Sequence, residues 1–332
     1  MLNPAAKLHK NIFGEPEEVP TRTGFGEGLV EAGDKDPRVV AVCADLAEST
    51  RILPFKEKYP KRYIEAGVAE QNLALVASGL ANYGKIPFIA SYATFSPGRN
   101  NEQIRTNICI NNVPVKVVGS HAGISVGPDG ATHQALEDIG LMRMLPHMTV
   151  ISPCDSEEAR KATLAAAAYP GPVYLRLARE KTPVMTTPET PFELGQAQVM
   201  WQPAKRKNPD VAIFATGPLL FNALLAAQKL EEKVPVVVVN VHTIKPLDEA
   251  AVVQWSKKAG AVVTVEEHQV SAGFGSAIAE VLAKKAPVPQ EFIGVHNQFG
   301  QSGKPEELIK HYGMDVEHIV AAVTKVFKRK KQ

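Results

Sequence analysis

The stretch EAGVAEQNLALVASGLANYG, residues 65–84, joins a polar start to an apolar run with helical spacing. Its Leu, Val and Ala residues, mixed with small Ser and Gly, predict a helix over residues 68–83 that is built for burial. Glu70 comes directly before the apolar part. An ionised carboxylate is costly to bury unless another group compensates its charge. By position alone, Glu70 is a first-turn residue that complements the helix dipole, and only the other motifs change this interpretation.

The composition is that of an ordinary globular protein. The chain has 332 residues, of which 45% are hydrophobic and 22% charged, and this length suits two domains. A formal net charge of +2 gives no strong field for nucleic acid or a membrane surface. The three cysteines are widely spaced and form no disulfide framework or zinc motif. No apolar run approaches the ~20 residues of a bilayer span, so we expect a cytoplasmic protein.

Buried strands alternate with helices in two parts of the chain, which predicts an α/β fold. In the first part, strands are predicted at residues 38–44, 86–92, 115–119, 149–152 and 173–177, and helices at 100–111, 134–145 and 156–169. In the second part, strands are predicted at residues 211–217, 234–241, 261–267 and 291–296. We therefore expect two domains, each a mostly parallel sheet covered by helices. The predicted boundaries are an arm at 1–20, a domain at 21–182, a linker at 183–196 and a domain at 197–332.

Polar residues gather where the first-domain strands end, which is the edge where open α/β sheets bind ligands. The most informative stretch there is GSHAGISVGPDGATHQALEDI, residues 119–139. His121 follows a buried strand, and the glycines behind it let the backbone approach a ligand closely. Thr132 is expected to open a helix with His133 in its first turn. Asp129 and Thr132 are candidate helix caps, but two histidines that bracket one glycine loop favour a functional site.

Three motifs together resemble the pyrimidine-binding domain of transketolase: GVAEQNLALVASGLA, the aromatic pair in SYATF, and SHAGISVGPDGATHQALEDIGLMRMLPHMTVISPCD. Residues 197–332 resemble the transketolase C-terminal domain. The resemblance implies thiamine diphosphate as the cofactor. It also implies that Glu70 hydrogen-bonds a ring nitrogen of the aminopyrimidine and thereby favours the imino tautomer that creates the nucleophilic carbon. A Glu70 shielded from water and raised in pKa would suit this proton sharing.

The resemblance implies roles for residues near the cofactor. Tyr92 and Phe95 match the aromatic positions that flank the pyrimidine ring, although on spacing alone they are strand-end core aromatics. Asp45, in ADL, matches an acidic residue near the cofactor. His121 and His133 match histidines that contact the substrate, and His121 is expected to assist proton movements and to hold donor oxygens.

The substrate-binding residues follow in the same way. Asp129 matches the residue that contacts a sugar hydroxyl. Arg22, Ser49 and Arg179 match the positions that hold a substrate phosphate, and the planar fork of arginine suits phosphate oxygens. Arg99 is a weaker candidate for this group because the loop FSPGR does not align cleanly with the longer transketolases.

The segment that binds the diphosphate through magnesium in full-length transketolases, a Gly-Asp-Gly strand end followed by Asn, is not found in this sequence. We therefore expect the C-terminal subunit of a split transketolase. Its N-terminal partner subunit would hold the diphosphate and Mg²⁺, in a heterotetramer with two copies of each chain. The implied reaction transfers a two-carbon ketol unit from a ketose phosphate such as xylulose 5-phosphate to an aldose phosphate such as ribose 5-phosphate.

Other interpretations remain open. The beta chain of a 2-oxoacid dehydrogenase has a matching glutamate, but that family departs from the GPDGATHQ loop. A deoxyxylulose-phosphate synthase fragment places arginine where His121 stands. A split transketolase for another sugar phosphate would carry the same core motif. A non-catalytic interaction protein would be expected to have lost Glu70 or the histidines. In the second domain, we interpret the pair Gly273 and Gly275 as packing rather than phosphate binding, and His268 as a domain-interface residue.

Overall fold

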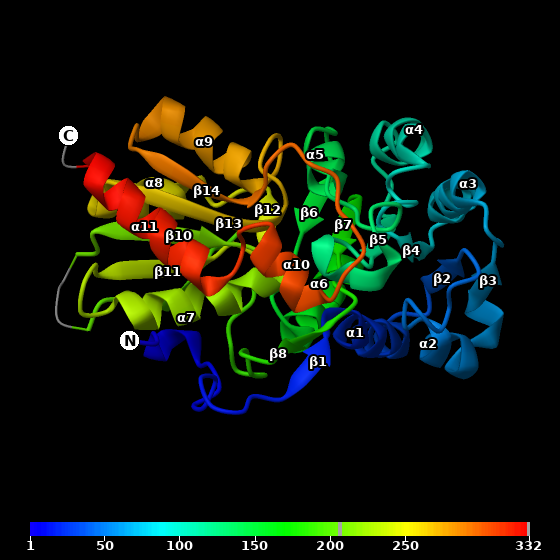
Figure 1. Ribbon diagram of the computed structural model, residues 1–332. Coiled ribbons are helices and arrows are strands. Elements are labelled where there is room, and N and C mark those ends of the chain that lie inside the picture. Colours follow the sequence, from blue (N-terminus) through cyan, green and yellow to red (C-terminus); the bar gives the residue numbers. More distant parts are fainter. Residues whose placement is uncertain (205–207, 331–332) are drawn as a thin grey trace.

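The structure is a computed structural model that describes residues 1–204 and 208–330. It contains a seven-stranded sheet and a five-stranded sheet, each covered by helices, so the predicted two-domain α/β fold is confirmed. Figure 1 shows the two sheets side by side, with α7, α8, α9 and α11 at one end of the molecule, α10 near the middle and α1 to α4 at the other end.

The first sheet has the strand order β12-β6-β7-β5-β4-β2-β3, and all its neighbouring strands are parallel except β12. Its strands are β2 (Val39–Cys43), β3 (Tyr63–Glu65), β4 (Ile86–Tyr92), β5 (Lys116–Ser120), β6 (Thr149–Ile151), β7 (Val173–Arg176) and β12 (Thr243–Lys245). The helices of this part are α1 (Thr21–Lys35), α2 (Leu53–Lys58), α3 (Glu70–Asn82), α4 (Asn101–Gln103), α5 (Asp138–Arg143) and α6 (Ser156–Ala168).

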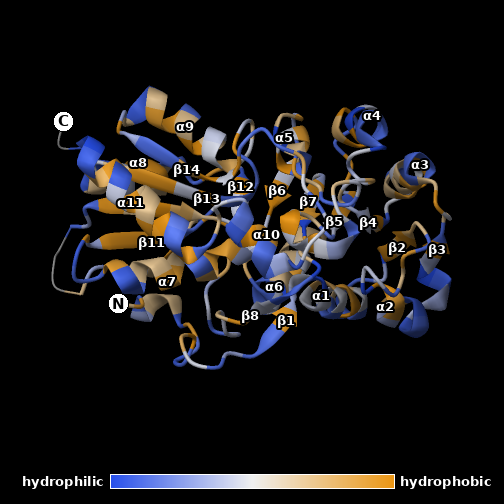
Figure 2. Cartoon of the chain, in the orientation of Figure 1, coloured by the Kyte–Doolittle hydropathy of each residue, from blue (hydrophilic) through white to orange (hydrophobic). Residues whose placement is uncertain are grey.

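Apolar side chains on both faces of this sheet explain its parallel arrangement. Every residue of β2 is buried. Val42 packs with α3 on one face, whereas Ala41 and Cys43 pack with α1 and α6 on the other. Figure 2 shows the same pattern as hydrophobic colouring on the central strands, with hydrophilic loops around them. A strand buried on both faces reads as a continuous apolar run, which is why the sequence predicts these strands well.

The second sheet has the order β14-β13-β10-β11-β9, with β9 antiparallel to β11 and the remaining pairs parallel. Its strands are β9 (Gln198–Trp201), β10 (Val211–Ala215), β11 (Val236–Asn240), β13 (Val262–Gln269) and β14 (Gln290–Val295). The helices of this part are α7 (Leu220–Leu230), α8 (Glu249–Ala259), α9 (Phe274–Lys285), α10 (Pro305–His311) and α11 (Val316–Lys330).

Two segments cross between the two parts of the chain, strand β12 and the N-terminal arm. Strand β12 follows residue 197 in the sequence but pairs with β6 of the first sheet. The N-terminal arm packs on β9, where the Asn3 N–H donates to the Met200 carbonyl at 2.8 Å and the Ile12 side chain is fully buried. The arm then forms β1 (Glu18–Pro20), which pairs with β8 (Lys181–Pro183) beside the first domain. These contacts link the two domains through segments that are far apart in the sequence.

Two predicted helices were wrong in extent. The helix predicted at 134–145 begins only at Asp138, because the backbone of Ala135 pairs with Ala122 and its carbonyl accepts from the Gly123 N–H at 2.9 Å. Thr132 therefore opens no helix, and the residues after it form turns. The helix predicted at 100–111 is a short α4 followed by a π-helix at Ile104–Cys109.

A buried ion pair of the first domain, Arg176 with Asp138, also hydrogen-bonds to the second domain. Arg176 at the end of β7 donates from Nε to Asp138 Oδ2 at 2.7 Å and from Nη2 to the Glu267 carbonyl of β13 at 2.8 Å. The Tyr174 hydroxyl donates to the same carboxylate at 2.6 Å. Burial by itself raises the pKa of Asp138, but Arg176 and the nearby His268 outweigh it and hold that pKa below its usual value.

Substitution of Asp138 by Asn is expected to lower the free energy of unfolding by about 3–5 kcal/mol, because it leaves the Arg176 guanidinium buried without its counter-charge. Urea denaturation followed by circular dichroism measures this change. The matched control is Glu280→Gln, which breaks the exposed pair of Glu280 with Arg143 and is expected to cost about 0–1 kcal/mol. Equal effects of the two substitutions would contradict the structural role of Asp138.

Candidate functional site

The carboxyl ends of four parallel strands lie next to one another at one edge of the first sheet, in the order β2, β4, β5, β7. Asp45 follows β2, Tyr92 ends β4, His121 follows β5, and Arg179 lies three residues beyond β7. Residues from distant parts of the sequence therefore meet at the edge where the sequence predicted a ligand site.

Glu70 is the first residue of α3, and its side chain is only 2% exposed. It shares one face of the helix with Leu73, Ala74 and Ala77, which are fully buried, and this helical spacing carries the carboxylate inward. Leu75 belongs to the same predicted apolar run but faces outward and is 44% exposed. The burial predicted for Glu70 is therefore confirmed.

Three polar groups meet Glu70 in its buried position. Arg99 donates from Nη1 to Glu70 Oε2 at 2.7 Å, and the Ser91 hydroxyl lies 3.4 Å from Oε1. Asn100 donates from Nδ2 to the Glu70 carbonyl at 2.9 Å. The guanidinium of Arg99 thus supplies the counter-charge that a buried carboxylate requires.

Four rings form a cluster beside this carboxylate. Tyr92 stacks on His121 with ring centroids 3.9 Å apart, and Phe95 lies 6.2 Å from Tyr92 in a stacked orientation. His133 meets Phe95 edge-on at 5.3 Å. The Arg99 guanidinium carbon lies 4.9 Å from the centroid of Phe95. The structure therefore brings together both predicted aromatic residues and both predicted histidines.

His121 is buried and held in an unusual backbone conformation, with a φ of 57°. Its Nδ1 lies 2.8 Å from the Ser120 hydroxyl, which leaves Nε2 for another partner. Burial, and then the positive charges of Arg22 and Arg179, lower its pKa from 6.5 to about 3. The imidazole is consequently neutral at physiological pH and is suited to exchanging hydrogen bonds with a ligand oxygen.

An arginine cluster lies beside His121. Arg22 donates from Nη1 to the Ser49 carbonyl at 2.6 Å, and Arg179 donates from Nη1 to the Val126 carbonyl at 2.6 Å. Burial, followed by the charges of Arg51 and Arg179, lowers the pKa of Arg22. The Nε atoms of Arg22 and Arg51 are buried and have no hydrogen-bond partner among the residues that the structure describes. Such a cluster is prepared for an anionic group that would pair with these donors.

Sequence reasoning gave no role to Arg51 and only a weak role in phosphate binding to Arg99. Arg51 stands two residues after Ser49, and that spacing is its only signal in the sequence. Arg99 was a weak candidate for the phosphate group, but the structure places it against Glu70. Asp45 lies in the turn after β2, Asp129 ends the 3₁₀-helix Ile124–Asp129, and both residues are exposed.

The glycine loop is held by contacts with the second domain. A Cβ atom on Gly123 would lie 2.4 Å from Glu267 Oε1, and the same oxygen accepts from the Ser125 N–H at 2.6 Å. Gln134 donates from Nε2 to the carbonyls of Ile124 and Gln301, both at 3.0 Å. Glycine at position 123 is thus required by a carboxylate of the protein itself.

The second domain offers no free phosphate site at its glycine pair. Glu266 accepts the N–H groups of Phe274 and Gly275 at 2.6 and 2.7 Å, so its carboxylate occupies the first turn of α9. His268 is buried, and its Nε2 accepts weakly from the Gly140 N–H of the first domain at 3.4 Å. Both predictions for this domain, packing glycines and an interface histidine, agree with these contacts.

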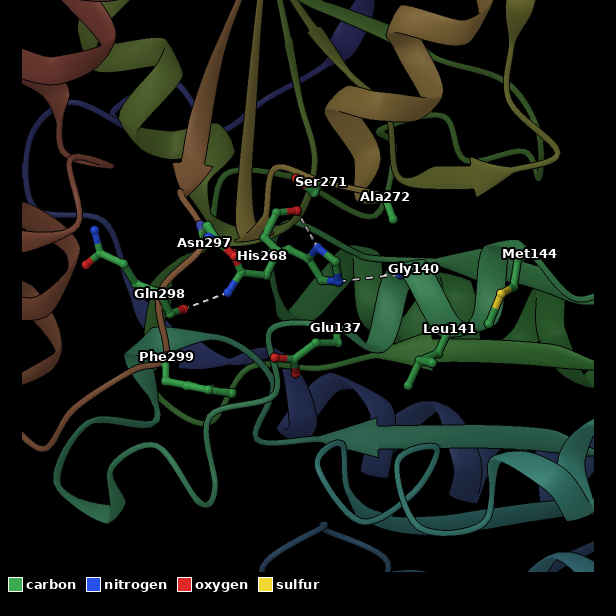
Figure 3. Close-up of a pocket in the computed structure, with 11 residues that line it drawn as sticks. Glu137, Gly140, Leu141, Met144, His268, Ser271, Ala272, Asn297, Gln298 and Phe299 are labelled. Carbon is green, nitrogen blue, oxygen red and sulfur yellow. Dashed lines mark hydrogen bonds between the residues drawn. The ribbon is translucent and has the colours of Figure 1, made fainter.

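A separate cavity of about 430 Å³ lies between the domains, and Figure 3 shows the residues around it. His268 and Gln269 come from the second domain, and Glu137, Leu141 and Met144 come from α5 and the residues beside it. It contains none of the residues predicted for the cofactor or the substrate.

Metal-binding and membrane-spanning features are not found in the described ranges. Across residues 1–204 and 208–330, no three His, Cys, Asp or Glu side chains are placed to hold a metal ion. Within the same ranges, no helix has the length and apolar character to cross a bilayer. The three cysteines are free and buried, and burial raises the pKa of Cys109 to about 11.

Comparisons with known proteins agree with this architecture. Residues 17–185 match the transketolase pyrimidine-binding domain, and residues 202–319 match the transketolase C-terminal domain. A subunit of the 6-deoxy-6-sulfo-D-fructose transketolase of Clostridium sp. (strain MSTE9) is 40% identical, over 95% of this chain and 96% of that protein. A subunit of the apulose-4-phosphate transketolase of Phocaeicola vulgatus is 32% identical, over 94% of this chain and 98% of that protein. A solved split-gene transketolase, an inactive beta4 tetramer, superposes with a TM-score of 0.87 at 42% identity, over 94% of this chain and 99% of that one.

His121 is expected to remain neutral between pH 5 and 8, since its pKa in the folded chain is about 3. The unfolded chain takes up this proton near pH 6.5, so the stability that the neutral ring contributes is lost as the pH falls below that value. Two-dimensional NMR of the imidazole C–H groups tests this, with the variant His121→Asn to identify the signals. A midpoint between pH 5 and 8 for those signals would contradict the described environment.

Proposed function

The chain belongs to the transketolase family, as the C-terminal section of a split enzyme, and on this premise we propose that it forms half of a thiamine-diphosphate-dependent ketol-transfer site. The observation that carries the proposal is the buried Glu70 carboxylate, whose ion-pair partner Arg99 lies over the face of Phe95. A carboxylate next to an aromatic face fits an aminopyrimidine ring, which hydrogen-bonds through a ring nitrogen and stacks through its plane.

Thiamine diphosphate, when bound, supplies a nucleophilic carbon and an electron sink for cleaving the bond next to a ketose carbonyl. Glu70 would bind the ring nitrogen and hold a proton there. Phe95 and Tyr92 would orient the ring, and Asp45 would approach the cofactor from the end of β2. The pyrimidine half of the cofactor is thus assigned to this chain.

The substrate would lie across His121 and the arginine cluster. Nε2 of the neutral His121 would hold a donor oxygen and move a proton at that atom, and His133, whose ring also contacts Tyr92, would contact the substrate. Arg22, Ser49 and Arg179 would bind the terminal phosphate, and Asp129 a sugar hydroxyl. The proposed reaction moves a two-carbon ketol unit from xylulose 5-phosphate to ribose 5-phosphate.

A partner subunit is part of the proposal. The related sulfofructose and apulose-phosphate proteins are transketolase subunits, and the related beta4 tetramer is inactive. These facts support an N-terminal partner that holds the diphosphate and Mg²⁺, in an assembly with two copies of each chain. A thiazolium ring must be held at both ends to react, which one half-site does not achieve.

A second candidate function is a split transketolase for another acidic sugar. The related proteins are subunits of transketolases for a sulfonated hexose and for apulose 4-phosphate, and this chain matches 96% and 98% of their lengths. The arginine cluster favours a substrate with a terminal anionic group. It recognises the charge of that group more than the identity of the sugar that carries it.

Ketol transfer is expected only when this chain is mixed with an N-terminal, diphosphate-binding chain, thiamine diphosphate and Mg²⁺. Coupled assays with xylulose 5-phosphate and ribose 5-phosphate measure it. In the mixture, Glu70→Gln is expected to lower kcat by roughly 10²- to 10⁴-fold, the range for removing a proton-transferring group. Activity of this chain alone, or a Glu70→Gln enzyme within a few fold of the parent, would refute the proposal.

Substitution of Arg22 by Gln is expected to lower kcat/KM for xylulose 5-phosphate by roughly 10- to 100-fold, because one charge-assisted hydrogen bond to the phosphate is lost. Unphosphorylated xylulose lacks that phosphate, so its kcat/KM is expected to change little. The exposed Arg38, which pairs with Asp36, provides the matched control Arg38→Gln. Equal losses on both donors would show that Arg22 supports the fold of the site rather than phosphate recognition.

A further inference from the structure

Arg99 occupies the place that the proposed function gives to the cofactor ring. Its Nη1 lies 2.7 Å from Glu70 Oε2, and its guanidinium carbon lies 4.9 Å from the centroid of Phe95. These are the two contacts, one to a carboxylate and one to an aromatic face, that an aminopyrimidine would make. Residues 1–204 and 208–330 offer Glu70 no other ion pair.

The chemical likeness between the two groups is close. A guanidinium is planar, donates N–H bonds in its plane and stacks on aromatic faces. An aminopyrimidine protonated at its ring nitrogen is also planar, donates in its plane and stacks. The guanidinium and the aminopyrimidine cannot both occupy the space between Glu70 Oε2 and the face of Phe95. Binding of one group therefore excludes the other.

We propose that Arg99 is an internal occupant of the aminopyrimidine half-site, which must leave Glu70 before the cofactor ring binds. This inference rests on the proposed function. In the chain without cofactor, Arg99 compensates the buried charge of Glu70 and covers Phe95. When the ring enters, it takes over both contacts, and the Arg99 side chain turns to solvent.

The surrounding geometry allows the side chain to move while its loop stays in place. The Arg99 side chain is 52% exposed, so a route to solvent is already open. Its backbone N–H donates to the Phe95 carbonyl at 2.8 Å, and the next residue, Asn100, is fully buried and bonded to the Glu70 carbonyl. A Cβ atom on Gly98 would lie 1.9 Å from the Thr94 carbonyl oxygen, so the turn before Arg99 is tightly packed. Release is therefore a rotation of the Arg99 side chain.

Such an occupant lowers the apparent affinity for the cofactor, because only the fraction of molecules with Arg99 withdrawn is competent to bind. The ion pair is half exposed on the arginine side, which limits its strength. Removing the guanidinium is therefore expected to tighten binding by roughly threefold to tenfold. A residue that merely supports Glu70 would have the opposite effect, since its loss would weaken binding.

The test is a calorimetric titration of Arg99→Gln in two arms. One arm uses the full chain alone with the free aminopyrimidine alcohol of thiamine, which needs neither Mg²⁺ nor the diphosphate site. The other uses the enzyme assembled with its partner, titrated with thiamine diphosphate and Mg²⁺. Arg99→Lys keeps the charge but loses the planar fork, so its affinity for the ligand is expected to lie between those of the parent and Arg99→Gln. It also replaces Arg99→Gln as the test variant if that protein does not fold. Arg38→Gln, which removes an exposed arginine elsewhere in the domain, is expected to bind as the parent does.

Tighter binding by Arg99→Gln, with Arg38→Gln unchanged, supports the inference. Unchanged or weaker binding by folded Arg99→Gln or Arg99→Lys overturns it, while normal cofactor binding by the parent leaves the proposed function standing. If the assembled parent and every variant fail to bind thiamine diphosphate, the proposed function is overturned and this inference with it.

Discussion

The compensated burial of one carboxylate organises this site. Glu70 lies at the start of α3 on the helix face that packs into the core, where an uncompensated charge would be strongly unfavourable. The positive end of the helix dipole and the Arg99 guanidinium compensate the negative charge of Glu70. Asn100, in the loop after β4, donates to the Glu70 carbonyl at 2.9 Å and so fixes that loop against α3. Phe95, in the same loop, is thereby held beside the carboxylate.

The second domain acts on the site through the glycine loop. Glu267 of β13 accepts the Ser125 N–H, and its carboxylate fills the space that a side chain at Gly123 would need. The carbonyl of the same Glu267 accepts from Arg176, which holds Asp138 at the start of α5. One residue of the second domain thus supports both ends of the segment that carries His121 and His133. This explains why a domain without predicted cofactor residues accompanies the pyrimidine-binding domain.

The sequence predicts this fold well wherever the signal is local. Strand β4 is predicted at residues 86–92 and observed at Ile86–Tyr92, because a buried parallel strand is an uninterrupted apolar run between polar turns. The start of α5 was missed because Ala135 pairs with Ala122, a contact that helical spacing does not reveal. Strand β12 was missed for a related reason, since its partner β6 lies about ninety residues earlier in the chain.

Some residues of the site can be predicted from sequence motifs, whereas others are found only from the structure. Motifs identify Glu70, Phe95 and the histidines, and the structure places them together. Two arginines depend on tertiary contacts instead. Arg51 approaches Arg22 through a backbone turn with positive φ, and Arg99 reaches Glu70 from the loop after β4. Spacing alone gives no information about either approach.

The most direct test of this account is a crystal structure of the chain assembled with its N-terminal partner, thiamine diphosphate and Mg²⁺. The account predicts a ring nitrogen of the aminopyrimidine within hydrogen-bond distance of the Glu70 carboxylate, the ring on Phe95, and Arg99 withdrawn to solvent. A bound cofactor whose ring makes no contact with Glu70, with the pair of Glu70 and Arg99 intact, would contradict it.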